Sequence, residues 1–283
     1  MKIGCHLSSS GGYVATAQTA ASIGANVFQF FTRNPRGGAA RARDKADEAA
    51  FVRFAAERGI GPALAHAPYT LNAAGADGRV RDFAFSVMLD DLRRLDAIPG
   101  AMYNFHPGAH VGQGAGEGVR LVADLLGRVF EAFGGVPGTK VLFETMAGKG
   151  TELGRDFAEV RRLIDAAEEA AGAKGVFGVC LDTCHVWDAG YDVAGDLDGV
   201  LAAFGREVGL ERLYAVHLND SMNARGSRKD RHEKIGRGKI GLDAFRRIVN
   251  HPALKDKPFY LETPCDLQGY KEEIALLKGL AEE

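Results

Sequence analysis

Six short apolar segments of this chain each end in a histidine or a carboxylate. The segments span 62–66, 102–106, 140–144, 177–182, 213–217 and 258–262, and their last residues are His66, His106, Glu144, Asp182, His217 and Glu262. Such short apolar runs are typical of buried strands. The ends of parallel strands meet at one edge, as they do at the mouth of a (β/α) barrel. Imidazole and carboxylate groups bind zinc and similar ions, so the pattern predicts a metal site at that mouth.

Strands and helices are expected to alternate strictly along the chain. Two further apolar segments, 2–6 and 27–32, raise the number of expected strands to eight. The amphipathic stretches between them predict helices over 13–23, 45–58, 79–97, 117–133, 155–171, 196–208, 242–250 and 270–281. This alternation predicts an α/β fold, a (β/α)8 TIM-type barrel with its active site at the C-terminal ends of the strands. An open, doubly wound sheet is the alternative architecture, but it usually has fewer strands.

Composition sets the broad class of protein. The chain is 46% hydrophobic and 25% charged, as in ordinary globular proteins, and nothing like a linker or repeat interrupts it, so we expect residues 1–283 to form one domain. A net charge of −2 argues against a surface that is basic throughout, although a local basic rim can still attract nucleic acid. Four cysteines without paired spacing and the lack of an 18-residue apolar run predict a cytoplasmic protein without a membrane partner.

Two local clusters extend the candidate ligands beyond the strand ends. His185 follows Asp182 by one helical turn, and Asp230 and His232 alternate in the long segment after the seventh strand. A single histidine is more often structural than metal-binding, so the prediction depends on the order and location of the whole set. One tetrahedral ion needs three or four ligands. Nine ligands therefore suit two or three ions that share a bridging carboxylate.

Two basic segments are expected on the same face of the barrel. Segment 223–239 has seven Lys and Arg residues, Arg228 and Arg231 among them, against two acidic residues. Segment 33–45, which follows the second strand, is also basic and includes Arg36. A charge run is usually a solvated surface, but the first segment also holds two candidate ligands. Basic loops that frame a metal pocket favour a polyanionic substrate whose phosphodiester reaches the ions.

The loop after His66 carries two further candidates for contacts with nucleic acid. Tyr69 and Leu71 follow the third strand closely. An aromatic or aliphatic side chain at such a position can act as a wedge between bases, although it more often packs against its own protein.

Longer ordered motifs surround these residues. They are Asn-Phe-His-Pro-Gly-Ala-His at 104–110, Asp-Thr-Cys-His at 182–185, Ala-Gly-Tyr-Asp at 189–192, His-Leu-Asn-Asp-Ser at 217–221, Asp-Arg-His-Glu at 230–233, Ile-Gly at 235–236 and Glu-Thr-Pro at 262–264. Together they resemble the endonuclease IV family of abasic-site endonucleases, from residue 3 to residue 264. The resemblance implies a TIM barrel with three zinc ions that acts in base excision repair. It would incise duplex DNA 5′ to an abasic site, leaving a 3′-hydroxyl and a 5′-deoxyribose phosphate.

The resemblance also implies a role for each site residue. His66, His106 and Glu144 would hold one ion; Glu144, Asp182, His217 and Glu262 a second; and His185, Asp230 and His232 a third, more exposed ion. Manganese can replace zinc at one of these sites. Arg36, Tyr69, Arg228 and Arg231 would lie in the loops that enter the damaged duplex. A single barrel suffices to contact a bent duplex, so a monomer is expected.

Two carboxylates are expected to be catalytic. Glu144 would bridge two ions, and Glu262 would orient the attacking water or help to deprotonate it, since zinc lowers the pKa of bound water towards 7. An abasic sugar loses little stacking when it is flipped into a pocket. The free-energy cost of flipping is therefore lower at an abasic site than at an intact nucleotide, which favours selection of abasic sites.

The chain departs from the family's usual pattern at three places. Gly37 and Gly38 stand where the family usually has Gln-Trp. Met146 and Lys149 stand where threonine and glutamine are usual, and Arg237 stands where an acidic residue is common. The first change puts the contacts of a DNA-binding loop in doubt, and none of them touches a candidate ligand.

Two other functions compete with this one. A divalent-metal sugar isomerase or epimerase on a related barrel would use Glu144, Asp182, His217 and Glu262 alone. It has no use for the other five candidate ligands or for two basic loops. A barrel that binds damaged DNA without cutting it is the second alternative, and retention of all nine ligands argues against it.

Overall fold

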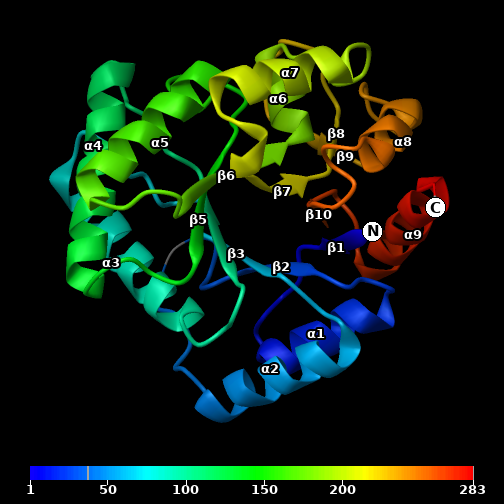
Figure 1. Cartoon of the computed structure of the whole chain (residues 1–283), viewed down its shortest axis with the longest axis horizontal. Coiled ribbons are helices and arrows are strands. Elements are labelled where there is room, and N and C mark those ends of the chain that lie inside the picture. The colour runs from blue at the N-terminus through cyan, green and yellow to red at the C-terminus, as the bar shows by residue number, and fades with distance from the viewer. Residues whose placement is uncertain (37, 283) are drawn as a thin grey trace.

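Eight parallel strands form one sheet in the computed structural model, which describes residues 1–36 and 38–282. The strands are β1 (Lys2–Cys5), β2 (Phe28–Phe31), β3 (Ala63–His66), β4 (Met102–Phe105), β5 (Lys140–Glu144), β6 (Phe177–Asp182), β7 (Leu213–His217) and β10 (Pro258–Leu261). Their order is β1-β10-β7-β6-β5-β4-β3-β2, and the helices surround them in Figure 1. The predicted (β/α)8 barrel is confirmed.

The sheet closes into a barrel between β1 and β2. Asn26 donates its backbone N–H to the carbonyl of Ile3 at 3.0 Å, and Leu7 donates to the carbonyl of Gln29 at 2.8 Å. His6 and Gln29 form a parallel bridge between the same two segments. Because the barrel is closed, the C-terminal ends of all eight strands meet at one mouth.

Eight helices cover the outside of the barrel, each close to its predicted span. They are α1 (Tyr13–Ser22), α2 (Lys45–Arg58), α3 (Gly78–Leu95), α4 (Ala115–Phe133), α5 (Phe157–Ala171), α7 (Leu197–Glu207), α8 (Leu242–Asn250) and α9 (Leu267–Leu280). Aspartates cap several N-termini; Asp44, for example, accepts from the backbone N–H groups of Ala46 and Asp47. None of the helices in the described residues is long and apolar enough to cross a membrane.

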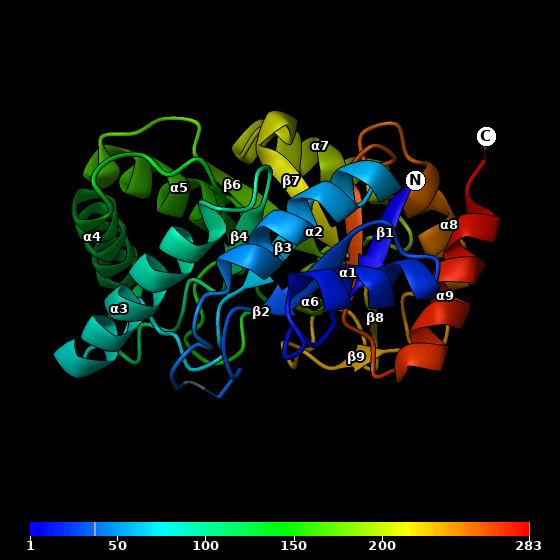
Figure 2. The same ribbon diagram turned by 90° about the horizontal axis from the view of Figure 1, so that it is seen from below.

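Four short elements were not predicted. They are helix α6 (Thr183–Ala189), the 3-10 turn η1 (Leu210–Arg212), and strands β8 (Asp220–Ser221) and β9 (His232–Glu233), which pair as an antiparallel hairpin. Most of α6 is buried, so its sequence lacks the polar face that reveals a longer helix. Figure 2 shows α6 and this hairpin at the same end of the barrel.

Two apolar clusters account for the interior. The larger lies between the strands and the helices. The smaller fills the inside of the barrel, and we call it the apolar plug: Val27, Leu64, Met102, Leu142, Cys180, Ala215 and Tyr260. Side chains alternate between the two faces of a strand, so residues two positions beyond the plug also point inward. The plug thereby supports whatever lies at the mouth.

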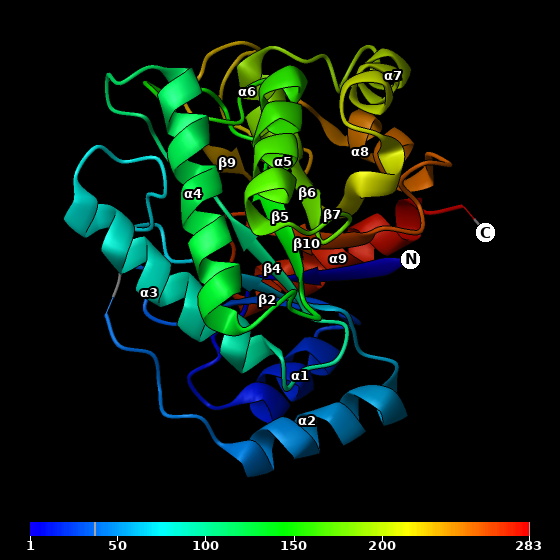
Figure 3. The same cartoon turned by 60° about the vertical axis from the view of Figure 1, so that its left-hand side comes forward.

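Helices α4 and α5 lie side by side, as Figure 3 shows. Gly127 of α4 makes their close approach possible, because a Cβ at this position would lie 2.7 Å from the carbonyl oxygen of Ala170. Gly116 belongs to the same helix, but a Cβ there would meet none of the described atoms within 4 Å. Gly116 can therefore serve as the control position for a substitution of Gly127.

Replacing Gly127 with alanine is expected to destabilise the barrel. The methyl group must displace the α5 backbone, and overpacking of this kind costs about 1–3 kcal/mol. That exceeds the gain of up to about 1 kcal/mol that alanine brings to a helix. Gly116→Ala is expected to leave stability unchanged or raise it by about 0.4–1 kcal/mol. Urea unfolding followed by circular dichroism measures both variants, and equal stabilities would contradict the close approach.

Candidate metal centre

A layer of polar side chains lies directly above the apolar plug. It consists of the residues two positions beyond the plug on seven strand segments: Gln29, His66, Asn104, Glu144, Asp182, His217 and Glu262. All are almost completely buried except Glu262, whose side chain is 13% exposed. Five of them were predicted as ligands. Gln29 and Asn104 were missed, although the alternation that identifies the plug would have found them.

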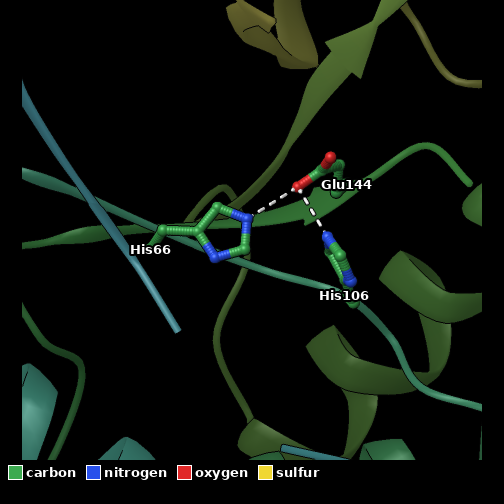
Figure 4. A group of neighbouring side chains, drawn as sticks. All are labelled: His66, His106 and Glu144. Atoms are coloured by element: carbon green, nitrogen blue, oxygen red, sulfur yellow. Dashed lines mark hydrogen bonds and ion pairs between the residues drawn. The ribbon is translucent and has the colours of Figure 1, made fainter. Parts of the chain in front are cut away.

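Glu144 is the centre of the first group of candidate ligands, shown in Figure 4. Its Oε2 lies 3.1 Å from Nε2 of His66 and 3.4 Å from Nε2 of His106. Asn104 donates an amide N–H to the same oxygen at 2.5 Å. His106 lies just beyond the end of β4, so it reaches Glu144 from the mouth and is 26% exposed.

His217 is the centre of the second group. Its Nδ1 lies 3.2 Å from Oε1 of Glu144, 3.3 Å from Oε2 of Glu262 and 3.7 Å from Oδ2 of Asp182. Glu144 therefore directs one oxygen at the first group and the other at the second. This is the arrangement that a carboxylate needs in order to bridge two cations.

The third group combines His185 of α6 with Asp230 and His232 at the hairpin. Oδ1 of Asp230 lies 3.0 Å from Nε2 of His185 and 3.6 Å from Nε2 of His232. Asp182 caps α6 by accepting the backbone N–H of His185 at 2.8 Å, which places the imidazole beside β6. Asp230 is 28% exposed, so this group lies on the open side of the site.

All nine predicted ligand residues are thus brought together, in the three groups that the resemblance implies. Within each group the available ligand atoms lie within 4.8 Å of one another. Zinc–ligand bonds of about 2.0–2.1 Å in a tetrahedron place the ligand atoms about 3.3–3.4 Å apart. The distances above fall around that value, so the groups suit small divalent cations. Their role as ligands stays a prediction.

Hydrogen bonds show which ring nitrogen of His66 and of His185 is available to bind a metal ion. Nδ1 of His66 donates to the carbonyl of Ala67 at 2.7 Å, and Nδ1 of His185 donates to the carbonyl of Thr145 at 2.8 Å. A carbonyl only accepts, so each neutral ring keeps a lone pair on Nε2. Those Nε2 atoms face carboxylate oxygens, which also carry only lone pairs. The arrangement requires a second proton or a cation in between, and it is typical of metal-binding histidines.

His232 gives the same indication more directly. Its Nδ1 lies 3.2 Å from the carbonyl of Glu262. Its Nε2 is buried and has no hydrogen-bond partner among the residues that the structure describes. Buried polar atoms are rarely left without a partner, so this nitrogen is oriented for a ligand such as a metal ion.

The electrostatics of the site keep its carboxylates ionised. Burial by itself would raise the pKa of Glu144, but the positive charges of His217 and His106 outweigh burial and hold that pKa well below its ordinary value. Burial likewise opposes ionisation of Asp230, but the charge of His185 prevails and lowers the pKa of Asp230 to about 2. Both groups are therefore negative at neutral pH, as metal ligands must be.

Cys184 is a neighbour of the site that the sequence did not single out. Its sulfur atom, Asp182 and His232 form a further set of possible ligand atoms. Burial and the negative charge of Asp182 raise the pKa of the Cys184 thiol. Since a thiolate is the metal-binding form, Cys184 is a weaker candidate than the two residues beside it.

The basic segment 223–239 is fixed over the third group by α6. Arg228 donates its backbone N–H to the carbonyl of Asp188 at 3.0 Å, and the backbone N–H of Asp230 donates to the Asp188 carboxylate at 2.8 Å. Arg228 and Asp230 both have a φ of 55°, a left-handed conformation that costs non-glycine residues about 1–3 kcal/mol. The side chains of Arg228 and Arg231 are exposed, as DNA contacts require. Arg225 of the same segment pairs with Asp192.

The basic segment 33–45 presents fewer free charges than predicted. Arg33 is only 7% exposed and pairs with Asp91 of α3 at 2.5 Å. Arg43 pairs with Glu48 of α2 at 2.8 Å. The prediction of a basic rim is wrong for these two residues, which instead attach the segment to the barrel. Arg36 is exposed.

Of the two candidate wedge residues, only Tyr69 lies on the surface. It is 60% exposed, and its ring packs edge-on against Phe31 with centroids 5.0 Å apart. Leu71 is buried in the core, so the prediction that it can enter DNA is wrong. Among the departures from the family pattern, Met146 is buried, and Gly37 lies outside the described residues.

A parallel barrel with clustered histidines and carboxylates at its mouth defines a broad class, the xylose isomerase-like TIM barrels. A family model with that description matches residues 17–280. The chain is 51% identical to a probable endonuclease 4 of Clostridium beijerinckii over 280 residues, covering 99% of both chains. It is 53% identical to a probable endonuclease 4 of Clostridium botulinum over 279 residues, covering 99% of this chain and 98% of the relative.

A solved structure agrees with these relatives. The structure of endonuclease IV from Thermus thermophilus matches with a TM-score of 0.87 and 34% identity, covering 99% of this chain and 98% of that one. The chain belongs to the endonuclease IV family. It is an enzyme, a nuclease of the hydrolase class.

Divalent ions are expected to raise the thermal stability of the protein. A ligand that binds only the folded state adds about 2.7 kcal/mol when its free concentration is 100 times its Kd. Calorimetry of chelator-treated protein, with and without added zinc, measures the shift in melting temperature. His185→Gln should lose part of the shift. His251→Gln should keep it, because His251 pairs with Asp198 outside the three groups. An unchanged melting temperature of the wild-type protein would contradict a metal site.

Proposed function

We propose that this chain is a zinc-dependent apurinic/apyrimidinic endonuclease that hydrolyses duplex DNA on the 5′ side of an abasic site. The observation that carries the proposal is the geometry of Glu144, whose two oxygens face two different groups of candidate ligands. Membership of the endonuclease IV family supports the same activity. The third group and the exposed arginines Arg228 and Arg231 lie at the open side, where a polymer can reach them.

The residues present fit three zinc ions. His66, His106 and Glu144 would hold the first; Glu144, Asp182, His217 and Glu262 the second; and His185, Asp230 and His232 the third. Imidazole and carboxylate donors suit zinc, and manganese can take one of the positions. When bound, zinc supplies a Lewis acid that neutralises phosphate charge and lowers the pKa of water.

Glu144 and Glu262 have different roles at the reacting phosphate. Glu144, fully buried, fixes the spacing of the first two groups. Glu262 is partly exposed and has lone pairs to spare, so it can accept a hydrogen bond from the attacking water and take its proton. The water passes a proton to Glu262 and its oxygen bonds to phosphorus. The bond from phosphorus to the 3′ oxygen breaks, and that oxygen takes a proton from solvent to become the 3′-hydroxyl. The 5′-deoxyribose phosphate remains on the other strand end.

Four exposed residues would contact the duplex. Arg36, Arg228 and Arg231 would neutralise phosphates, and Tyr69 would support the flipped or unstacked site. A nucleotide without a base loses little stacking when it leaves the helix, which favours abasic sites over intact DNA.

We further propose that residues 1–283 act as one domain and as a monomer. All nine candidate ligands come from one chain, so the site needs no second copy. The four cysteines, all within the described residues, are free thiols, which accords with work in the cytoplasm.

The two rival functions account for less of the site. A sugar isomerase or epimerase would use the second group alone and would leave His66, His106, His185, Asp230 and His232 without a purpose. A binder of damaged DNA would need no buried carboxylate held ionised at the mouth, as Glu144 is.

Replacing Glu144 with glutamine is expected to abolish incision. The amide keeps the shape of the side chain, but it cannot offer an anionic oxygen to both groups. The substrate is an end-labelled duplex with one tetrahydrofuran abasic analogue, which cannot break by β-elimination. Wild-type protein with zinc should cut once, 5′ to the analogue, and leave a 3′-hydroxyl; the variant should leave the duplex uncut.

The control for this assay is His251→Gln, which should cut at the wild-type rate. Intact duplex should stay uncut by all three proteins. If folded wild-type protein holds about three ions but cuts with neither zinc nor manganese, the endonuclease proposal fails, and turnover of keto sugars becomes the next assay.

Replacing Arg231 with alanine is expected to weaken DNA binding and reduce its salt dependence. Each lost phosphate contact lowers the slope of log K against log salt by about 0.9. Fluorescence anisotropy with an abasic duplex in EDTA, which prevents cutting, measures the slope. Arg225→Ala is the matched control in the same segment, because Arg225 already pairs with Asp192. Equal slopes for Arg231→Ala and wild-type protein would remove Arg231 from the DNA interface.

A further inference from the structure

Gln29 is a fully buried polar residue on the inner face of β2. It belongs to the polar layer, two positions beyond Val27 of the apolar plug. The neighbouring residues Phe28 and Phe30 point outward into the larger core. Burial of an amide is costly unless its N–H and carbonyl groups are hydrogen-bonded, so the partners of Gln29 indicate what it does.

The amide of Gln29 joins two residues of the second metal group. Its Nε2 lies 2.5 Å from Oε1 of Glu262 and 2.8 Å from Nδ1 of His6. Its Oε1 lies 2.6 Å from Nε2 of His217. A single side chain thus contacts one candidate ligand on β7 and another just after β10, the two strands that lie farther round the barrel beyond β1.

The chemistry of these partners fixes the positions of the protons. A carboxylate only accepts, so the NH2 end of the amide must face Glu262 and the carbonyl end must face His217. The amide carbonyl also only accepts, so His217 must carry a proton on Nε2. When the ring gives up its other proton to bind a metal ion, the lone pair is on Nδ1, the atom that faces Glu144, Asp182 and Glu262.

We propose that Gln29 is a positioning residue of the second metal group. It holds the proton of His217 on Nε2, so that Nδ1 is the metal-binding atom. It also holds one oxygen of Glu262, which leaves Oε2 directed at the same site. The inference rests on the proposed function, since it assigns Gln29 a role only if this group binds a metal ion.

Gln29→Met tests this role, because methionine has a similar length and makes none of the three hydrogen bonds. Partners that orient metal ligands typically contribute 10–100-fold to metal affinity or activity. Zinc affinity, measured by competition with a chelator, should fall by about that factor. The kcat for the abasic duplex should fall while KM stays unchanged, because buried Gln29 cannot touch DNA. Long-range ¹H–¹⁵N spectra of labelled histidines should show the Nε2 proton of His217 in the wild-type protein and its loss or redistribution in the variant.

Gln29→Glu is the second variant, and it keeps the test decisive if Gln29→Met does not fold. Glutamate retains an oxygen that accepts from His217, but its other oxygen faces the Glu262 carboxylate, so the two acids repel each other or share one proton and Glu262 is no longer held by an N–H donor. His217 should therefore keep its proton on Nε2, while kcat falls. Gln18→Met is the control, since Gln18 is an exposed residue of α1 and should change none of these quantities.

The outcomes separate this inference from the function on which it rests. If the wild-type protein neither binds zinc nor cuts, both proposals fail. If the wild-type protein does both, and the Gln29 variants match it in zinc affinity, kcat and the His217 spectrum, the role of Gln29 alone is overturned. A lower zinc affinity and kcat in Gln29→Met, with the Nε2 proton of His217 retained in Gln29→Glu, support it.

Discussion

The candidate metal centre depends on the burial of Glu144 at the centre of the barrel mouth. An isolated buried carboxylate is too costly to remain ionised, so its surroundings have to supply positive charge and hydrogen bonds. His217, His106 and His185 supply positive charge or hydrogen bonds, and Asn104 supplies an amide N–H. The apolar plug beneath closes off water from one side, which strengthens each of these interactions. A barrel whose strand ends all meet at one mouth is the architecture that brings so many groups to a single carboxylate.

The side chains of the site differ in their exposure to solvent, from the buried base to the open side. Glu144, Asp182 and His217 are fully buried, whereas Asp230 and His106 reach the solvent. Rigid strands hold the buried groups, and short loop elements hold the open ones. Chemistry that needs fixed geometry can therefore take place at the base of the site, while a large substrate enters from the side of α6 and the hairpin.

Much of this could be predicted from the sequence, for reasons that particular residues make clear. The strand-end ligands were identifiable because parallel strands of known period must deliver them to one edge, and His185, Asp230 and His232 were identifiable through ordered motifs. Gln29 was missed because the alternation places it in the polar layer only once the plug residues are known, and its partners His217 and Glu262 lie 188 and 233 residues away. Arg33 was misjudged because its partner Asp91 lies 58 residues away on α3. Charge pairing over such a distance depends on tertiary structure, which local composition does not contain.

The fold alone does not distinguish a nuclease from a sugar isomerase, since one family description covers both. The second group, centred on His217, would suffice for the single ion of a sugar isomerase. The difference lies in what surrounds it. His66 and His106 form a further group of candidate ligands on one side of Glu144, and α6 with the β8–β9 hairpin provides another beyond Asp182. Neither addition alters a strand of the barrel, because each uses the last residue of a strand or a loop that follows it. The groups that would distinguish a nuclease from an isomerase therefore lie at strand ends and in the loops. The buried polar layer, which includes Gln29, Asn104 and Glu144, supports them from below.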